Sequence, residues 1–403
     1  MGKAKLIDYV DKYSIIACFL LPFVVPSKNI YLNFILRTYI VVILGIFSWF
    51  RIFQKKKISQ LEIAYKIPLA VIILMLILDL FLYHDSYAMF GGIYMQIGIV
   101  SLLSIIGICI NSINKKIYLL FQGLFLSCIA LSIFSFYFQS TIYGSLFSNR
   151  LIGPFFQSDI LAIYLSLGFL AGLIFIGSLK SIKSKFLFSI GESIIMTGII
   201  FTQTRLVIIL LLLISCIYLI YTLPKKIRLV SIIFMTLTAS LIIFVSIILR
   251  PNYNLSSLYD STIYRFELQS AAISHSNSSI FIGKSVYGLS SDLECKNLNK
   301  FYELRKTCNN YIFQSSHNLF LDHSIMFGYI AGIMMFFAGA YSIYICFKNP
   351  NNNTVLLGLI LTTTTIYYFS NVNSIELELL YWLLIGGVIS SKPKIKNPLT
   401  KNN

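Results

Sequence analysis

Three arginines and one histidine lie beside polar residues at four separate places in an otherwise apolar chain. Arg150, Arg205 and Arg265 keep their charge at any biological pH, and a guanidinium binds phosphate oxygens through two parallel hydrogen bonds. The imidazole of His317 titrates near neutrality, so it can accept a proton from a hydroxyl group. In combination, these residue types predict a site that binds a diphosphate and activates an attacking hydroxyl.

Each arginine also has an ordinary structural interpretation. Arg205 can extend from the end of an apolar span to the membrane interface. Arg265 can be a solvated residue on an amphipathic helix over residues 261–275, and Arg150 can pair with Asp159. No single arginine is specific, so the prediction depends on their joint occurrence on one side of the membrane.

The histidines divide in the same way. His317 can be a polar residue that leads into a helix capped by Asn318, because asparagine is a preferred N-cap residue. We interpret His275 and His323 as structural. His317 remains the candidate base because it stands where a long polar stretch meets the next apolar run.

The composition indicates that the chain carrying these residues is a membrane protein. Of the 403 residues, 57% are hydrophobic and 12% are charged, and the mean hydropathy is +0.80. A soluble protein with these values would expose large apolar patches to water, so lipid must be the solvent. The net charge of +17 does not indicate a nucleic-acid partner, because excess Lys and Arg in a membrane protein usually mark cytoplasmic loops.

The hydropathy pattern predicts one all-α, polytopic integral membrane domain over residues 1–403, in contact with membrane lipids. About a dozen spans of roughly 20 residues fit this length. We predict twelve helices, because isolated strands cannot satisfy their backbone in lipid, over residues 11–27, 31–50, 67–83, 90–112, 117–137, 160–178, 186–203, 206–222, 229–249, 318–347, 354–370 and 375–391.

The basic residues predict the orientation of these spans. With a cytoplasmic N-terminus and alternating spans, about two thirds of the 32 Lys and Arg residues fall in cytoplasmic segments. The short outer loops then hold only Lys28, Arg150 and Arg205. This distribution places both termini in the cytoplasm and Arg150, Arg205, Arg265 and His317 at the outer face.

One long polar loop, over residues 250–317, is predicted between the ninth and tenth spans. It contains Cys295 and Cys308, whereas the other five cysteines lie inside apolar runs. If the loop faces an oxidising compartment, we expect a disulfide between these two cysteines. The loop has no paired-carboxylate spacing that would hold a divalent ion, so we expect neither a metal nor a cofactor.

Four carboxylates in or near the spans leave a transporter as an alternative. Asp79, Glu192, Glu376 and Glu378 could belong to an ion path. We find no charge ladder or matched halves that favour it. Asp79, Glu376 and Glu378 also lie near the predicted outer ends of their spans, where we expect water to reach them.

The polar segments resemble motifs of the O-antigen ligase and polymerase family of bacterial envelope glycosyltransferases. The family's R-x-x-G-x-F-x-x-x-N-x-x-A pattern is matched from Arg150 to Ala162, with Asp159 where Asn is usual. Its T-x-S/T-R pattern is matched from Thr202 to Arg205. The remaining matches are Arg265 with Gly283, where the usual Pro is absent and Gly288 stands for the second glycine, and Ser316-His317-Asn318 with the glycines Gly328 and Gly332.

The resemblance covers roughly residues 150–335 and implies a GT-C-like, metal-independent, inverting glycosyltransferase. It implies that Arg205 and Arg265, with Arg150 and Asn318, bind the diphosphate of an undecaprenyl-diphosphate-linked glycan. It also implies that His317 activates the acceptor hydroxyl at the periplasmic face of the bacterial inner membrane.

The resemblance leaves the acceptor open. An O-antigen ligase transfers the glycan to a sugar of the lipid A core in lipopolysaccharide biosynthesis, whereas a polymerase adds it to another repeat unit. The Thr-Gln-Thr-Arg order, the one long loop and the His-Asn at its end favour a ligase. A lipid-linked sugar flippase or another transporter is the non-enzymatic alternative, but short loops throughout would be expected of it.

Overall fold

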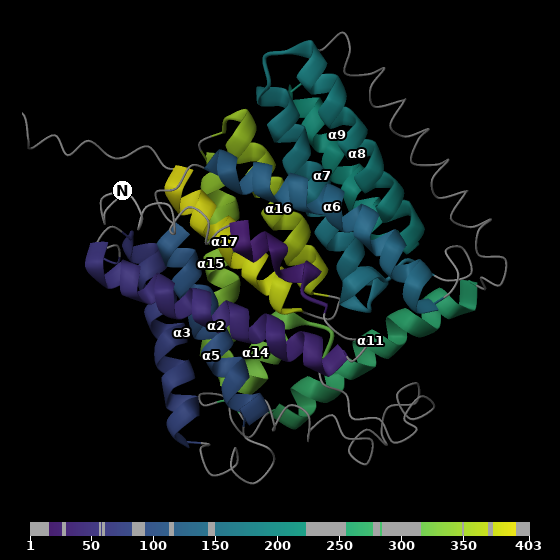
Figure 1. Ribbon diagram of the computed structural model, residues 1–403. Helices are drawn as coiled ribbons and strands as arrows, with labels where there is room; N and C mark the ends of the chain where they lie inside the picture. Colours follow the sequence, from purple (N-terminus) through teal and green to yellow (C-terminus); the bar gives the residue numbers. More distant parts are fainter. Residues whose placement is uncertain are drawn as a thin grey trace, which may run out of the picture.

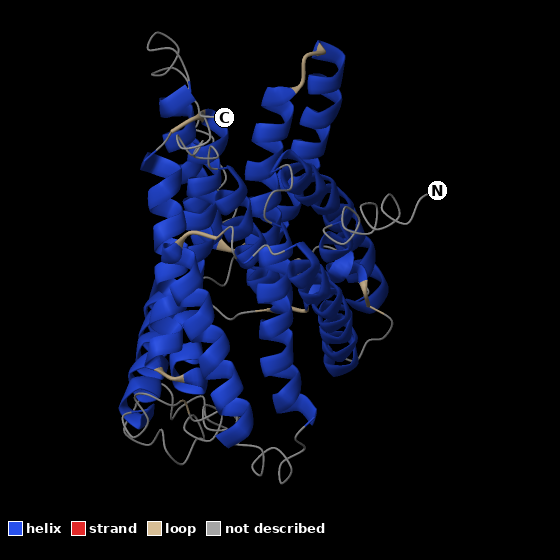
Figure 2. Cartoon of the chain, turned by 90° about the vertical axis from the view of Figure 1, so that its left-hand side faces the viewer, coloured by secondary structure: helices blue, strands red, loops and turns tan. Residues whose placement is uncertain are grey.

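The computed structural model describes residues 16–25, 30–55, 58, 61–82, 93–112, 117–143, 150–222, 255–276, 283, 316–348, 350–369 and 374–391. These residues form helices and short connections, without any strand among them (Figure 2). The all-α architecture expected from the composition is therefore confirmed for this part of the chain.

The helices follow the predicted apolar runs to within a few residues in most places. In Figure 1 they are α2 (Ile30–Lys55), α3 (Ile63–Leu82), α5 (Ile93–Ser112), α6 (Ile117–Tyr143), α7 (Ser158–Ser178), α8 (Ile182–Thr202), α9 (Arg205–Thr222), α11 (Leu255–Ser276), α14 (Leu319–Phe327), α15 (Tyr329–Lys348), α16 (Asn352–Tyr368) and α17 (Ile375–Ser391). Two 3₁₀ turns, η1 (Leu21–Phe23) and η3 (Gly153–Phe155), also occur in the described part of the chain.

Within the part of the chain that the structure describes, five helical segments are long and apolar enough to cross a membrane. They are Leu32–Gln54, Leu119–Thr141, Ser158–Gly177, Ile182–Thr202 and Tyr329–Lys348. These helices agree with the expected all-α membrane protein, while the number of twelve spans stays a prediction. The predicted span over residues 229–249 lies outside the described residues.

Helix α7 is the central element of the side of the molecule that carries the candidate site. It packs against α6, α8, α9 and α16, and 78% of its apolar segment is buried. Small residues allow this close approach: Gly168 of α7 lies against Cys128 of α6. The hydroxyl of Ser132 in α6 also donates to the carbonyl of Ile194 in α8 at 2.9 Å.

The predicted single span over residues 318–347 is wrong, because two helices occupy this stretch. Helices α14 and α15 are separated at Gly328, whose φ of +93° is a conformation that residues with a Cβ rarely adopt. Gly332 of α15 lies against the carbonyl of Phe320 and the side chain of Ser324. The chain therefore turns back on itself at Gly328, and a hydropathy plot cannot detect this because both helices are apolar.

The carboxylates of α17 are buried and paired, which corrects the expectation that water reaches them. Glu376 is 4% exposed and Glu378 is 8% exposed. Glu376 pairs with Arg37 of α2 at 2.6 Å, and His323 of α14 contacts Glu378 through Nε2 at 3.0 Å. His323 thus has the structural role expected of it, and these pairs join α17 to α2 and α14.

Asp79 of α3 is likewise buried, at 1% exposure.

Arg37 additionally donates to the carbonyls of Pro22, Val24 and Pro154. Because Pro154 belongs to η3, this arginine connects the N-terminal part of the chain to the turn that precedes α7. The turn that leads into α7 and Asp159 is thereby held in place.

Candidate active site

A network of hydrogen bonds around Asp159 joins three segments of the chain. Arg150 donates from Nη2 to Asp159 Oδ1 at 2.6 Å and to the hydroxyl of Thr204 at 2.8 Å. The Thr204 hydroxyl donates in turn to Asp159 Oδ1 at 3.0 Å. The Nε of Arg150 donates to the carbonyl of Thr202 at 2.9 Å. The structural interpretation of Arg150, a pair with Asp159, is therefore correct.

The backbone after Arg150 is fixed to the ends of two helices. Leu151 donates its N–H to the carbonyl of Phe201 in α8 at 2.9 Å, and Ile152 donates to the side chain of Gln139 in α6 at 3.4 Å. Asp159 itself lies in the first turn of α7, where a carboxylate is stabilised by the helix dipole. Asp159 is consequently held at one position by α6, α7 and α8.

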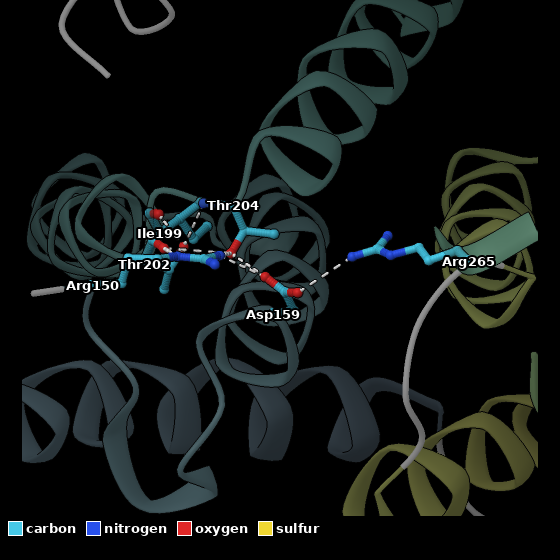
Figure 3. Close-up of polar contacts among 6 residues, drawn as sticks. All are labelled: Arg150, Asp159, Ile199, Thr202, Thr204 and Arg265. Carbon is cyan, nitrogen blue, oxygen red and sulfur yellow. Dashed lines mark hydrogen bonds and ion pairs between the residues drawn. The ribbon is translucent and has the colours of Figure 1, made fainter. Parts of the chain in front are cut away.

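Arg265 approaches Asp159 from the opposite side, as Figure 3 shows. Its Nη2 lies 3.9 Å from Asp159 Oδ2, and both side chains are about one-third exposed. Asp159 thus stands between two arginines. The contact of Arg150 with Asp159 is short and shared with Thr204, whereas the contact of Arg265 is at the limit of an ion pair. An incoming anion can therefore replace Asp159 as the partner of Arg265 more readily than as the partner of Arg150.

Arg265 is positioned by the packing of α11 on α14. Leu268, Ala271 and Ala272 of α11 are buried and form a small apolar cluster with Ile325 of α14. The two alanines leave room for the helices to approach closely. Helix α11 contains the whole of the helix predicted over residues 261–275, and its apolar face packs against the helix that follows His317.

His317 lies at the start of this segment and lines a pocket of about 250 Å³ together with Asp159 and Tyr367. The ring of Tyr264 in α11 contacts its imidazole edge to face, at 6.5 Å between ring centroids. Burial, and next the positive charge of Arg265, lower the pKa of His317 to about 4, while the charge of Asp159 acts in the opposite direction. The imidazole is therefore neutral at pH 7 and able to accept a proton.

Asp322 was not predicted from the sequence as a site residue, but it orders the backbone around His317. Its Oδ1 accepts a hydrogen bond from the N–H of Ser316 at 2.7 Å, and both residues are buried. The side chain of Asn318 caps α14 by accepting from the N–H of Leu321 at 3.1 Å. The capping interpretation of Asn318 is correct, and its role in donor binding stays a prediction.

Gly283 lies against the opposite end of α14. A Cβ at this position would clash with the backbone carbonyl of Met326 and approach the N–H of Phe327. Glycine is thus required at position 283 by a close approach of two backbones.

Arg205 begins α9 one residue after Thr204, at the end of the Asp159 network, and its side chain is partly buried. The structure therefore brings Arg150, Arg265 and His317 together around Asp159, whereas Arg205 is placed only by its position next to Thr204 at the start of α9. Cys295 and Cys308 lie outside the described residues, and so does the side chain of His275. Among the described residues, no group of three or more His, Cys, Asp and Glu side chains is arranged to hold a metal ion.

Backbone strain is concentrated at this site. Phe156, Gln203 and His317 are the non-glycine residues with a left-handed backbone conformation in the described part of the chain, at φ of 57°, 53° and 60°. Phe156 and His317 line the pocket, and Gln203 lies between Thr202 and Thr204. Such strain costs about 1–3 kcal/mol per residue and clusters at functional sites, which makes this pocket a candidate functional site.

Comparison with known family models found no match, and a search of curated proteins also found none. The functional assignment therefore depends on the geometry of the site and on the motifs given above.

Proposed function

We propose that this protein is a glycosyltransferase that takes a glycan from a membrane lipid diphosphate and transfers it to a hydroxyl acceptor. The observation that carries this proposal is the position of Asp159. It pairs with both Arg150 and Arg265 and lines the same pocket as His317. Asp159 thus connects two arginines to a pocket that a neutral base also lines, in a protein whose helices are suited to lipid.

In this proposal the donor diphosphate binds Arg265. A phosphate group carries more negative charge than a carboxylate and offers more acceptor oxygens, and a guanidinium binds it in a two-point contact. The long contact between Arg265 and Asp159, 3.9 Å, is exchanged for this interaction. Arg150 remains bonded to Asp159 and Thr204 and contributes its charge from a fixed position, while Arg205 at the head of α9 serves as a further phosphate ligand.

His317 accepts the proton of the acceptor hydroxyl as its oxygen attacks the anomeric carbon. The new C–O bond forms while the bond from that carbon to the diphosphate oxygen breaks, so the configuration is inverted. The diphosphate departs with the bonding electrons, and the arginines neutralise the charge that develops on it. The bound diphosphate raises the pKa of His317 above its value of about 4, which makes the imidazole a better base when the donor is present.

The motif resemblance favours an O-antigen ligase within this class. The donor is then an undecaprenyl-diphosphate-linked O-polysaccharide, and the acceptor is a sugar of the lipid A core at the periplasmic face of the inner membrane. No metal or cofactor takes part in this mechanism.

Two experiments test the proposal. Purified protein is incubated with labelled lipid-linked glycan and lipid A core, and release of undecaprenyl diphosphate is measured together with transfer of label. Glycosyl transfer is expected in the wild type and not in Arg205→Ala, Arg265→Ala or His317→Ala at equal membrane levels. Wild-type transfer in any of these variants would remove that residue from the mechanism.

Deletion of the gene in its host identifies the acceptor. A ligase is expected to leave lipid A core without any O-antigen and to let glycan accumulate on the lipid carrier. Core that carries a single repeat unit would indicate a polymerase instead. An unchanged lipopolysaccharide ladder would contradict the assignment to this pathway.

A further inference from the structure

The pocket that Asp159 and His317 line also contains aromatic and amide side chains, which a diphosphate site does not require. Phe156 forms part of its wall, Gln157 and Asp159 supply polar atoms, and His317 and Tyr367 lie further along its lining. Its volume of about 250 Å³ is smaller than the 300–1,000 Å³ typical of sites for larger ligands. The space suits one ring with an apolar face and a polar edge.

The wall formed by Phe156 is held in an unfavourable backbone conformation. Its φ is 57°, which a residue with a bulky side chain rarely adopts. The ring of Phe138 in α6 contacts the Phe156 ring edge to face, at 5.4 Å between centroids. Packing therefore holds an aromatic ring at the pocket, in a backbone conformation that a glycine would adopt with less strain.

The polar wall is formed at the beginning of α7. Gln157 is the N-cap residue of this helix, yet its side chain makes no capping hydrogen bond, and it is exposed. A carboxamide offers both a donor and an acceptor to neighbouring hydroxyls. Asp159 Oδ1 is already shared between Arg150 and Thr204, so Gln157 is the side chain best placed to bind a neutral polyhydroxyl ligand.

We propose that this pocket binds a single pyranose ring of a glycan substrate, with the apolar face of the ring on Phe156 and its hydroxyls bonded by Gln157. A pyranose combines a C–H face with hydroxyls around its edge, which matches the aromatic wall and the polar rim. An acyl chain would leave the polar atoms unpaired. The inference rests on the proposed function, and it adds the subsite in which a sugar hydroxyl or the anomeric carbon meets His317.

The pyranose can come from two sources, the first sugar of the donor glycan or the accepting sugar. Both are tested as free glycans, released from the carrier lipid and from lipid A by mild acid. Binding of each glycan to the purified full-length protein is measured by saturation-transfer NMR and titration. The variants are Gln157→Ala, which removes the carboxamide, and Phe156→Leu, which removes the aromatic face but keeps an apolar side chain.

One of the two glycans is expected to bind the wild type, and each variant is expected to bind it about tenfold more weakly, as for the loss of one hydrogen bond or ring contact. Phe186→Leu is the matched control, because Phe186 is 71% exposed on α8 and does not line the pocket; it should bind like the wild type. The thermal midpoint of each variant shows whether it is folded.

Binding of neither glycan to the wild type, or equal binding by folded variants and wild type, would overturn the subsite. These outcomes are separate from those of the transfer assay. Glycan binding without any transfer would contradict the proposed reaction but not the pyranose subsite. Transfer by the wild type, with unchanged glycan binding in both variants, would contradict the pyranose subsite but not the proposed reaction.

Discussion

The carboxylate of Asp322 accepts a hydrogen bond from the backbone N–H of Ser316 at 2.7 Å. His317 stands directly after Ser316 and has a left-handed φ of 60°. Asp322 belongs to α14. The residue that follows it in this helix, His323, is hydrogen-bonded to Glu378 of α17. The backbone that carries the candidate base is thereby attached to the helical core through a buried carboxylate, and Asp322 is a positioning residue for His317.

Replacement of Asp322 tests this role. Asp322→Leu is expected to lower kcat by about 10- to 100-fold, because misplacement of a catalytic group by about 1 Å has an effect of this size. The KM for the donor should change little, since Asp322 is not in the arginine cluster. Asp322→Asn keeps an oxygen that can accept from Ser316 and should recover most of the activity. Steady-state kinetics of the two variants measure this difference.

Asn351→Ala is the control for Asp322. Asn351 caps α16 by accepting from the N–H groups of Asn353 and Thr354, so its loss should cost about 1 kcal/mol of stability and leave kcat unchanged. Equal kcat in wild type and Asp322→Leu would show that Asp322 does not position the base.

The pH dependence of the reaction reports the charge on His317. Burial, and next the charge of Arg265, disfavour the imidazolium and lower the pKa of His317 from the ordinary 6.5 to about 4. Activity requires the neutral form, so kcat/KM should fall only as the pH drops towards 4. In the kcat profile the acid limb should lie at higher pH, because the bound diphosphate favours the protonated form. Coincidence of both limbs near pH 6.5 would contradict this electrostatic environment.

The contact between Asp159 and Arg265 predicts opposite effects of two substitutions on donor binding. In Asp159→Asn the side-chain oxygen can still accept from Arg150 and Thr204, but the negative charge near Arg265 is lost. The KM for the donor is expected to decrease several-fold, since an ion pair at this distance and exposure is worth up to about 1 kcal/mol.

Arg265→Ala is expected to raise the same KM and to abolish most transfer. Donor titrations at fixed acceptor concentration distinguish the two effects. An unchanged KM in Asp159→Asn would show that the carboxylate does not compete with the diphosphate for Arg265.

Gly283 is expected to tolerate no Cβ. In Gly283→Ala the new methyl group meets the backbone of Met326 and Phe327 at the end of α14, and backbone cannot move aside as a flexible side chain can. Overpacking of this kind costs about 1–3 kcal/mol, so a lower thermal midpoint and reduced transfer are expected.

Gly177 in α7 provides the matched control for this substitution. A Cβ there would meet nothing within 4 Å, and Gly177→Ala should be neutral or slightly stabilising because alanine favours the helix. A wild-type thermal midpoint and activity in Gly283→Ala would show that the two backbones are not in close contact in the working protein.

Local features of the sequence predicted a substantial part of this site. The pair of Arg150 and Asp159, the cap at Asn318 and the helix that carries Arg265 were each among the interpretations made from neighbouring residues. Such features are recognisable because they arise within one or two turns of helix or one short loop. The membrane class was equally accessible, because the preference of each side chain for lipid or water is a property of the residue itself.

Tertiary structure alone decided which charges meet. Arg37 and Glu376 are 339 residues apart, and Arg265 reaches Asp159 only because α11 packs on α14 through Leu268 and Ile325. No local pattern encodes such pairs, since they depend on how whole helices pack. The break at Gly328 was hidden for a related reason: hydropathy measures the solvent that a residue prefers, and it is the same on both sides of the turn.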